Sequence, residues 1–232
     1  MHASTSQAPA SDALTRVRMR GEERRQQFID AALHLFSSSG FRGTSTRAIA
    51  EAAGVSEALL FRHFPTKADL YAAILQQKAR EAGFDERFDA LRRLTKRTDD
   101  RAVVQYLVRA ILESYRRDPE FERLMLYAAL ERHELARTSR QLFGEPAFAL
   151  LREYVVDRQR KGVFRPGEPS LLVFALVGLP AYFSIAHRLL GLQFADISEK
   201  AAADLFTRIV LDGIRVVRRG TSRRPTDRRT SK

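Results

Sequence analysis

Cysteine is absent from this sequence of 232 residues, and so is tryptophan. A chain without cysteine forms no disulfide and no thiolate metal site. A reducing cytoplasm is the compartment that this composition favours. The length allows one large or two small domains with a substantial core.

Long hydrophobic runs are also scarce. Residues 1–15 are small and polar, and they lack the apolar segment of a signal peptide. The most apolar run, residues 171–186, is shorter than the roughly 20 residues that span a bilayer. It also contains Pro180 and Ser184. We therefore expect a buried helix here and no membrane segment.

Patterns of catalytic or metal-binding residues are missing too. The chain has no His-Glu-x-x-His motif, no phosphate-binding glycine loop and no Gly-x-Ser-x-Gly turn. Glu131, His133 and Glu134 lie close together, but a solvated helix face explains them better than acid–base catalysis. We expect no metal, no cofactor and no enzymatic activity. The five histidines are scattered: His2, His34, His63, His133 and His187.

Positive charge is in excess, with a formal net charge of +12. This favours an anionic partner, either nucleic acid or an acidic membrane. Residues 215–232 hold eight basic side chains and one acidic one, so much of the excess is a tail. We expect residues 1–20 to be a disordered basic lead-in and residues 220–232 a disordered basic tail. Arg16, Arg18 and Arg20 are either an arm that reaches DNA or a solvated lead-in.

The periodicity of apolar residues predicts an all-α fold of about nine helices. The run over residues 170–191 is apolar nearly all round, which predicts a helix enclosed on every side, kinked at Pro180 and closely approached by a neighbour at Gly178. Residues 84–98 are mixed and charged and are interpreted as a linker, and residues 137–144 as a loop. Besides two short helices within residues 44–64, helices are expected over residues 22–39, 66–83, 99–117, 118–136, 145–162, 170–191 and 198–220.

Residues 44–67 have the pattern of two short helices around one turn. Ser45 or Thr46 caps the first helix, and Ser56 caps the second. Gly54 allows the sharp turn between them, and Pro65 ends the second helix. This is a helix-turn-helix, whose second helix enters a DNA major groove. We expect a DNA-binding head over residues 21–66, joined by the helix that follows to a larger helical domain over residues 67–219.

The same region carries a family resemblance. Residues 28–71 resemble the DNA-binding head of the tetracycline-repressor-like (TetR) transcriptional regulators. The matching positions are Thr-Ser-Thr-Arg-x-Ile-Ala-x-x-Ala-Gly-Val-Ser, then Leu-Phe-x-His-Phe, then Lys67 and Leu70. The resemblance implies a bacterial, cytoplasmic, nucleoid-associated regulator. Such a protein is most often a repressor that binds a pseudo-palindromic operator in double-stranded DNA and is released by a small molecule.

Side chains of the two short helices are candidates for DNA contacts. Arg47 can donate two hydrogen bonds to guanine, and Glu57 can accept one from cytosine. Lys67, at the start of the next helix, is suited to a phosphate. Phe61 stands where many family members carry a tyrosine, and it lacks the phosphate-binding hydroxyl. The full predicted set is Ser45, Thr46, Arg47, Ser56, Glu57, Ala58, Leu59, Phe61, Arg62, His63 and Lys67.

Large side chains in the C-terminal half form a candidate ligand site. As a set they line a mostly apolar cavity with a few polar groups, or each simply fills a dense core. No basic cluster interrupts residues 170–191, so the expected effector is an apolar or amphipathic small molecule. The predicted set is Met125, Phe148, Tyr154, Phe174, Tyr182, Phe183 and His187.

Small and apolar residues on the last two helices suit a four-helix interface in a homodimer, and the resemblance implies that arrangement. The alternative is that these residues close the core of a monomer.

Two other functions remain open from the residues alone. One is a helical enzyme with an accessory DNA-binding head. The other is a membrane-surface protein that works through its basic tail.

Overall fold

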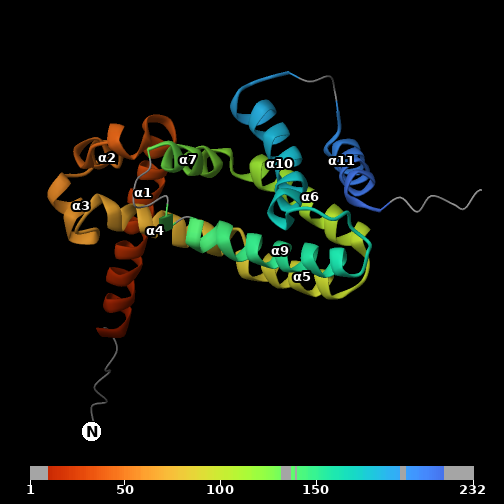
Figure 1. Cartoon of the computed structure of the whole chain (residues 1–232). Helices are drawn as coiled ribbons and strands as arrows, with labels where there is room; N and C mark the ends of the chain where they lie inside the picture. The colour runs from red at the N-terminus through yellow and green to blue at the C-terminus, as the bar shows by residue number, and fades with distance from the viewer. Residues whose placement is uncertain (1–9, 132–136, 139, 194–196, 217–232) are drawn as a thin grey trace, which may run out of the picture.

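The computed structural model describes residues 10–131, 137–138, 140–193 and 197–216. These residues form ten α-helices and two short π-helical segments, so the predicted all-α class is confirmed. Figure 1 shows a head built from the first helices at one end and a larger helical body at the other. The described part of the chain contains no strand beyond a single bridge between Phe164 and Arg215.

Four helices form the head and the link to the body: α1 (Ala10–Gly43), α2 (Thr46–Ala52), α3 (Glu57–His63) and α4 (Lys67–Glu81). The predicted start of the first helix at Glu22 is wrong, since α1 begins at Ala10. Its N-terminal half extends away from the head (Figure 1). The predicted disorder is therefore wrong for residues 10–20, whereas residues 1–9 and the tail 220–232 lie outside the described residues.

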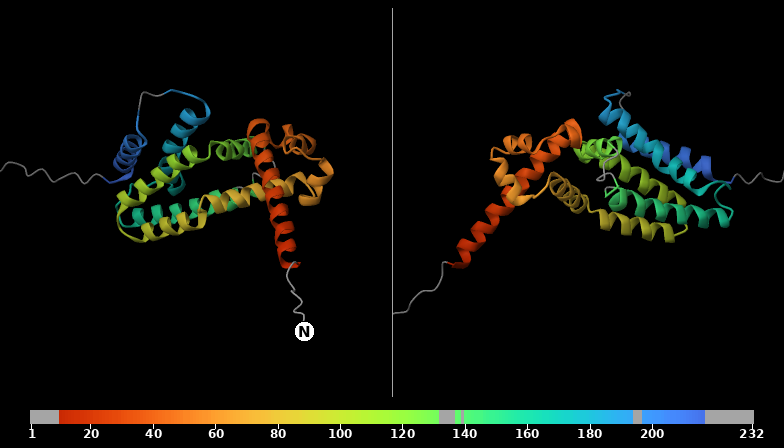
Figure 2. Two further views of the ribbon diagram at one scale, coloured as in Figure 1. Left: turned by 180° about the vertical axis from the view of Figure 1, so that it is seen from behind. Right: turned by 60° about the vertical axis from the view of Figure 1, so that its left-hand side comes forward.

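The body consists of α5 (Phe84–Lys96), α6 (Asp100–Arg117), α7 (Pro119–Leu130), η1 (Arg140–Gly144), α9 (Glu145–Arg160), α10 (Pro169–Ser184), η2 (Ile185–Leu189) and α11 (Glu199–Ile214). Helices α5 and α9 lie on one side of α6, and α10 and α11 lie side by side on the other (Figures 1 and 2). Helix α7 is the part of the body that lies next to the head (Figure 1).

The interpretation of residues 84–98 as a linker is wrong, because Phe84–Lys96 form α5. Phe84, Phe88, Leu91 and Leu94 follow one another at helical spacing, and Leu91 is buried against the body core. Gly83, in the left-handed conformation with φ 57°, separates this helix from α4. The charges between the apolar positions obscured a regular amphipathic helix. The predicted loop over residues 137–144 is also wrong in part, because residues 140–144 form η1.

The head core extends into α7. Phe28, Phe36, Ile49 and Leu60 of the head belong to the same buried cluster as Leu124 and Ala128 of α7. Three polar contacts reinforce this junction: His34 Nδ1 lies 2.9 Å from Glu120 Oε1, the Tyr127 hydroxyl donates to the Ser38 carbonyl, and Glu131 binds the turn near the end of α1. The head is therefore continuous with the body through α1 and α7.

A turn at Gly40, near the end of α1, is held by Glu131. Gly40 has φ 72°, which ends the regular helix at the predicted residue. The Glu131 carboxylate accepts hydrogen bonds from the backbone N–H groups of Phe41 (3.1 Å) and Arg42 (3.2 Å). A Cβ atom at position 40 would lie 2.3 Å from Glu131 Oε1. Gly40 is therefore required both by the backbone conformation and by the close approach of Glu131.

A buried ion pair ties the body together. Asp100, at the start of α6, is 4% exposed. It accepts a hydrogen bond from the Tyr154 hydroxyl (2.5 Å) and lies 2.7 Å from Arg158 Nε, both residues being on α9. Arg215, which follows α11, lies 3.9 Å away. This single carboxylate therefore connects α6, α9 and the end of α11.

Helix α10 is not enclosed on every side, which corrects the sequence prediction. Val173 and Leu176 are buried, but Leu171, Phe174 and Tyr182 are between 62% and 67% exposed. The helix continues through Pro180, and the change to π-helical geometry comes at Ile185. Together α10 and η2 span 21 residues, long and apolar enough by length and composition to cross a membrane, so the predicted shortfall in length is wrong.

We expect substitution at Gly40 to reveal the contact with Glu131. Gly40→Ala should lower the free energy of unfolding by about 2–4 kcal/mol, because it adds displacement of Glu131 to left-handed backbone strain. Gly54→Ala is the matched control: Gly54 has φ 69° and open space at its Cβ position, so its loss should be about 1–2 kcal/mol. Chemical denaturation measures both.

In a Glu131→Ala background, Gly40→Ala should cost less, because only the backbone strain and the 3.2 Å approach of the new Cβ to Tyr127 Cδ1 remain. Equal losses for Gly40→Ala in the two backgrounds would show that Glu131 does not constrain this turn.

Candidate functional site

Helices α2 and α3 form the helix-turn-helix, with caps at the predicted residues. The Ser45 hydroxyl accepts from the Ala48 N–H (3.0 Å), and the Ser56 hydroxyl accepts from the Leu59 N–H (3.3 Å). At the end of α2, the N–H groups of Gly54 and Val55 donate to the Glu51 and Ala50 carbonyls, both at 3.0 Å. This pair of bonds is a Schellman motif, which needs the left-handed Gly54.

Two carboxylates engage the polar side chains at the start of α2. The Thr46 hydroxyl donates to the Glu57 carboxylate, which joins α2 to α3. Arg47 Nε lies 2.9 Å from Glu51 Oε1, and both side chains are largely exposed. The hydrogen bond to Glu51, together with its negative charge, raises the pKa of Arg47. Arg47 is therefore a fully charged, accessible donor, whereas Glu57 already holds a partner.

The exposed face of α3 carries mostly apolar and basic groups. Ala58 and Arg62 are exposed, Phe61 is 44% exposed, and Leu59 is partly buried against the head core. His63 packs on Phe28 with ring centroids 5.4 Å apart. Burial lowers the pKa of His63, and the positive charges of Arg25, Arg62 and Arg24 lower it further. His63 is therefore a neutral hydrogen-bonding group at neutral pH.

Lys67 has a role that the sequence did not suggest. Its ammonium donates to the carbonyls of Phe41 (2.6 Å) and Thr44 (2.8 Å) and lies 4.1 Å from the centroid of the Phe41 ring. Burial lowers the pKa of Lys67, and the Glu131 carboxylate opposes this shift. An ammonium has three N–H donors, so one remains for a phosphate at the start of α4.

The seven candidate ligand residues lie in different surroundings. Met125 packs against the head core, and the Tyr154 hydroxyl is occupied by Asp100. Phe174 and Tyr182 are exposed on α10. The ring nitrogen Nδ1 of His187 lies 3.1 Å from the Leu192 carbonyl. Phe148 and Phe183 are partly buried against the body core, where Phe148 contacts Phe174, and Phe183 contacts His187 and Phe206.

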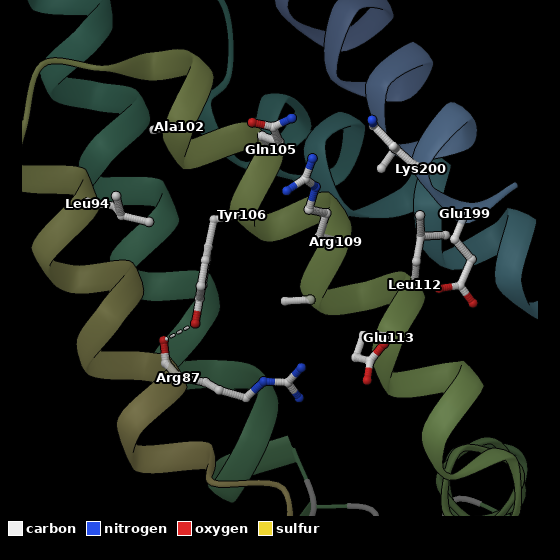
Figure 3. Close-up of a pocket in the computed structure, with 12 residues that line it drawn as sticks. Arg87, Leu94, Ala102, Gln105, Tyr106, Arg109, Leu112, Glu113, Glu199 and Lys200 are labelled. Carbon is white, nitrogen blue, oxygen red and sulfur yellow. Dashed lines mark hydrogen bonds between the residues drawn. The ribbon is translucent and has the colours of Figure 1, made fainter.

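A groove of about 820 Å³ lies elsewhere in the body, between α5, α6 and α11 (Figure 3). None of the seven candidate ligand residues lines it. Sequence reasoning missed this site because it interpreted α5 as a linker, although the spacing of Phe84, Phe88, Leu91 and Leu94 signals that helix. Its lining residues are Arg87, Leu94, Ala102, Gln105, Tyr106, Arg109, Ala110, Leu112, Glu113, Glu199, Lys200 and Ala203.

We expect Lys67→Met to destabilise the head. The variant keeps the aliphatic stem and removes two charge-assisted hydrogen bonds, so the free energy of unfolding should fall by about 1–3 kcal/mol. Lys161→Met is the control, since its exposed pair with Asp157 is worth at most about 0.5 kcal/mol. Thermal unfolding followed by circular dichroism measures both, and equal stability of the two variants would contradict the structural role of Lys67.

Comparisons with known proteins agree with this architecture. The family model of bacterial regulatory proteins, tetR family, matches residues 28–74, and the tetracyclin repressor-like C-terminal domain matches residues 101–212. The chain is 29% identical over 207 residues to the HTH-type transcriptional regulator RutR of Escherichia coli (strain K12), covering 83% of this chain and 91% of RutR.

Two further proteins show the same likeness. The HTH-type transcriptional repressor NicS of Pseudomonas putida is 29% identical over 201 residues, covering 84% of this chain and 92% of NicS. The crystal structure of AibR in complex with isovaleryl coenzyme A and operator DNA has a TM-score of 0.59 at 18% identity, covering 80% of this chain and 97% of AibR. The matched models cover the head and most of the body, and the chain therefore belongs to the TetR family of DNA-binding transcriptional regulators and is not an enzyme.

Proposed function

We propose that this regulator is a homodimeric repressor that binds a pseudo-palindromic operator and is released by a small molecule. NicS is named a transcriptional repressor, which supports repression rather than activation. The AibR complex, which contains both isovaleryl coenzyme A and operator DNA, supports a regulator that binds a small molecule as well as DNA. We further propose that the protein works in the bacterial cytoplasm in association with the nucleoid. The observation that carries the proposal is the exposed recognition surface of α2 and α3.

In this proposal the contacts to DNA divide into two kinds. Arg47 leaves Glu51 and donates to a guanine edge, and exposed Ala58 and Phe61 contact bases through apolar surface. Arg62, His63 and the third N–H of Lys67 face phosphates. The other predicted residues hold the two helices in place. Ser45 and Ser56 cap them, Thr46 and Glu57 join them, and Leu59 packs on the head core. Glu57 thus acts by positioning Thr46 rather than by accepting from cytosine.

The proposed dimer interface combines the exposed faces of α10 and α11. Leu171, Phe174 and Tyr182 line one face of α10, and Leu205 and Ile209 line the neighbouring face of α11; all five are at least 46% exposed. Between them, a side chain added at Gly178 would meet no atom of the same chain within 4 Å. A partner helix explains both the apolar surface and the space above the glycine.

Lipid is a less suitable cover for α10. Its opposite face, with Val173 and Leu176, is built into the body core alongside residues of α6 and α11. A helix that crossed a bilayer would have to leave that core. The partner subunit covers the exposed face without any such rearrangement.

We expect Arg47→Ala and Arg62→Ala to weaken DNA binding differently. The protein first selects duplexes from a random DNA pool, and the enriched site should be pseudo-palindromic. Arg47→Ala should cost about 1–3 kcal/mol on that site and relax preference at one position. Arg62→Ala should weaken all duplexes alike and lower the salt slope by about one.

Fluorescence anisotropy at several salt concentrations measures these effects. Equal affinity of the wild-type protein for every duplex at moderate salt would contradict the repressor proposal. A uniform loss for both variants would contradict only the assignment of Arg47 to a base.

We expect Gly178→Glu to dissociate the dimer without unfolding the protomer. A glutamate there would be buried without a partner in the dimer but solvated in the monomer. Gly21→Glu is the control, because Gly21 on α1 also has open space at its Cβ position. Sedimentation velocity and circular dichroism measure the two properties; a Gly178→Glu variant that stays dimeric would place the interface elsewhere.

A further inference from the structure

The groove between α5, α6 and α11 has an apolar floor. Leu112 and Ala203 are buried there, and Leu94 and Tyr106 are partly buried beside them. The Tyr106 hydroxyl donates to the Arg87 carbonyl (3.0 Å), which fixes α5 against α6 at the base of the groove. Its volume of about 820 Å³ is in the range of small-molecule sites. A ligand of this groove therefore has an apolar body.

The acidic groups that face the groove already have basic partners. Glu113 lies 2.7 Å from Arg116, and Glu199 lies 3.0 Å from Arg188 and 3.5 Å from Arg116. The hydrogen bond from Arg116 lowers the pKa of Glu113 against the opposing effect of burial, and Arg87 contributes to that lowering. Both acids therefore already have arginine partners, and neither is free to attract a cation.

The basic groups of the lining are less well matched. Within the described part of the chain, no hydrogen bond or ion pair engages the Arg87 guanidinium or the Lys200 ammonium. Arg109 lies 3.8 Å from Asp204, whose other neighbour is Gln105 at 3.1 Å. Figure 3 shows Arg87 at one end of the groove and Arg109 and Lys200 at the other. Positive charge is therefore in excess around an apolar floor.

We propose that this groove binds an amphipathic organic anion, with a carboxylate at Arg87 or at Arg109 and Lys200 and an aliphatic or aromatic body over Tyr106 and Leu112. The anion supplies the acceptor that Arg87 and Lys200 lack, and the floor accepts its apolar part. This inference rests on the proposed ligand-released repressor, and it names the site and the ligand class. It also departs from the seven candidate residues, which lie on α7, α9, α10 and η2.

The groove has a physical connection to the head. Helix α5 follows α4 directly at Gly83. Asp118 is the residue that follows α6, and its carboxylate lies 2.8 Å from Lys78 of α4. Burial alone would lower the pKa of Lys78, but Asp118 and Glu81 outweigh it and raise that pKa. These two connections, at Gly83 and at Lys78, attach the C-terminal end of α4 to the body. A ligand that moves α5 relative to α6 therefore acts on both of them.

The test is calorimetric titration of the full-length protein with hexanoate, octanoate and decanoate, each beside the alcohol and the amine of equal chain length. We expect the carboxylates to bind at least roughly tenfold more tightly than the alcohols and the amines to bind most weakly. One of the two variants Arg87→Met and Lys200→Met, whichever removes the cation that holds the carboxylate, should weaken the best carboxylate roughly tenfold, and the other shows which end of the groove the carboxylate leaves empty. Arg93→Met, an exposed arginine on α5 outside the lining, is the matched control and should leave binding unchanged.

Ala110→Phe, which fills the groove from α6, should abolish binding while the protein remains folded by circular dichroism. The inference is overturned if no carboxylate binds, if alcohols bind equally well, or if the Arg87→Met and Lys200→Met variants match Arg93→Met. Affinity of the ligand-free protein for its selected duplex is measured in parallel. Specific DNA binding without carboxylate binding would reject this inference alone, whereas loss of sequence preference would reject the proposed function.

Discussion

The turn over residues 40–44 is the constraint on which the relation between head and body depends. Glu131, at the end of α7, binds its N–H groups, and Lys67, at the start of α4, binds its carbonyls. The negative carboxylate thus binds the N–H groups of this backbone segment, and the positive ammonium binds its carbonyls. Gly40 leaves the space that the Glu131 carboxylate occupies. Because α7 belongs to the body, the orientation of the recognition helices is set by residues outside the head as well as within it.

The helix-turn-helix was predictable from the sequence because its signals are local. Ser45, Ser56 and Thr66 cap helices at the expected residues, and Gly54 turns as expected, since caps and tight turns depend on near neighbours. The charged stretch of α5 was misinterpreted because its apolar stripe is narrow. The second role of Lys67 and the contact between Glu131 and Gly40 were not predictable, because they join segments far apart in sequence.

The exposed face of α10 shows a different limit of sequence reasoning. An apolar helix predicts burial, but the sequence alone does not say whether the same chain or another one supplies the cover. In the described residues the body core covers Val173 and Leu176, while Phe174 and Tyr182 stay exposed. The candidate ligand residues show the same limit, because the sequence does not say which of their large side chains lie in the head core, in the body core or on an outer face.

The buried cluster around Asp100 limits which amino-acid substitutions the body tolerates. Its carboxylate serves the Tyr154 hydroxyl and Arg158, with Arg215 nearby, and it is 4% exposed. Loss of Asp100 alone leaves a buried guanidinium without its counter-charge, and loss of Arg158 alone leaves a buried carboxylate, so either single step is costly. A substitution at one of these positions is therefore tolerated best when its partner is replaced at the same time, and apolar residues fit this site only when they replace the whole cluster.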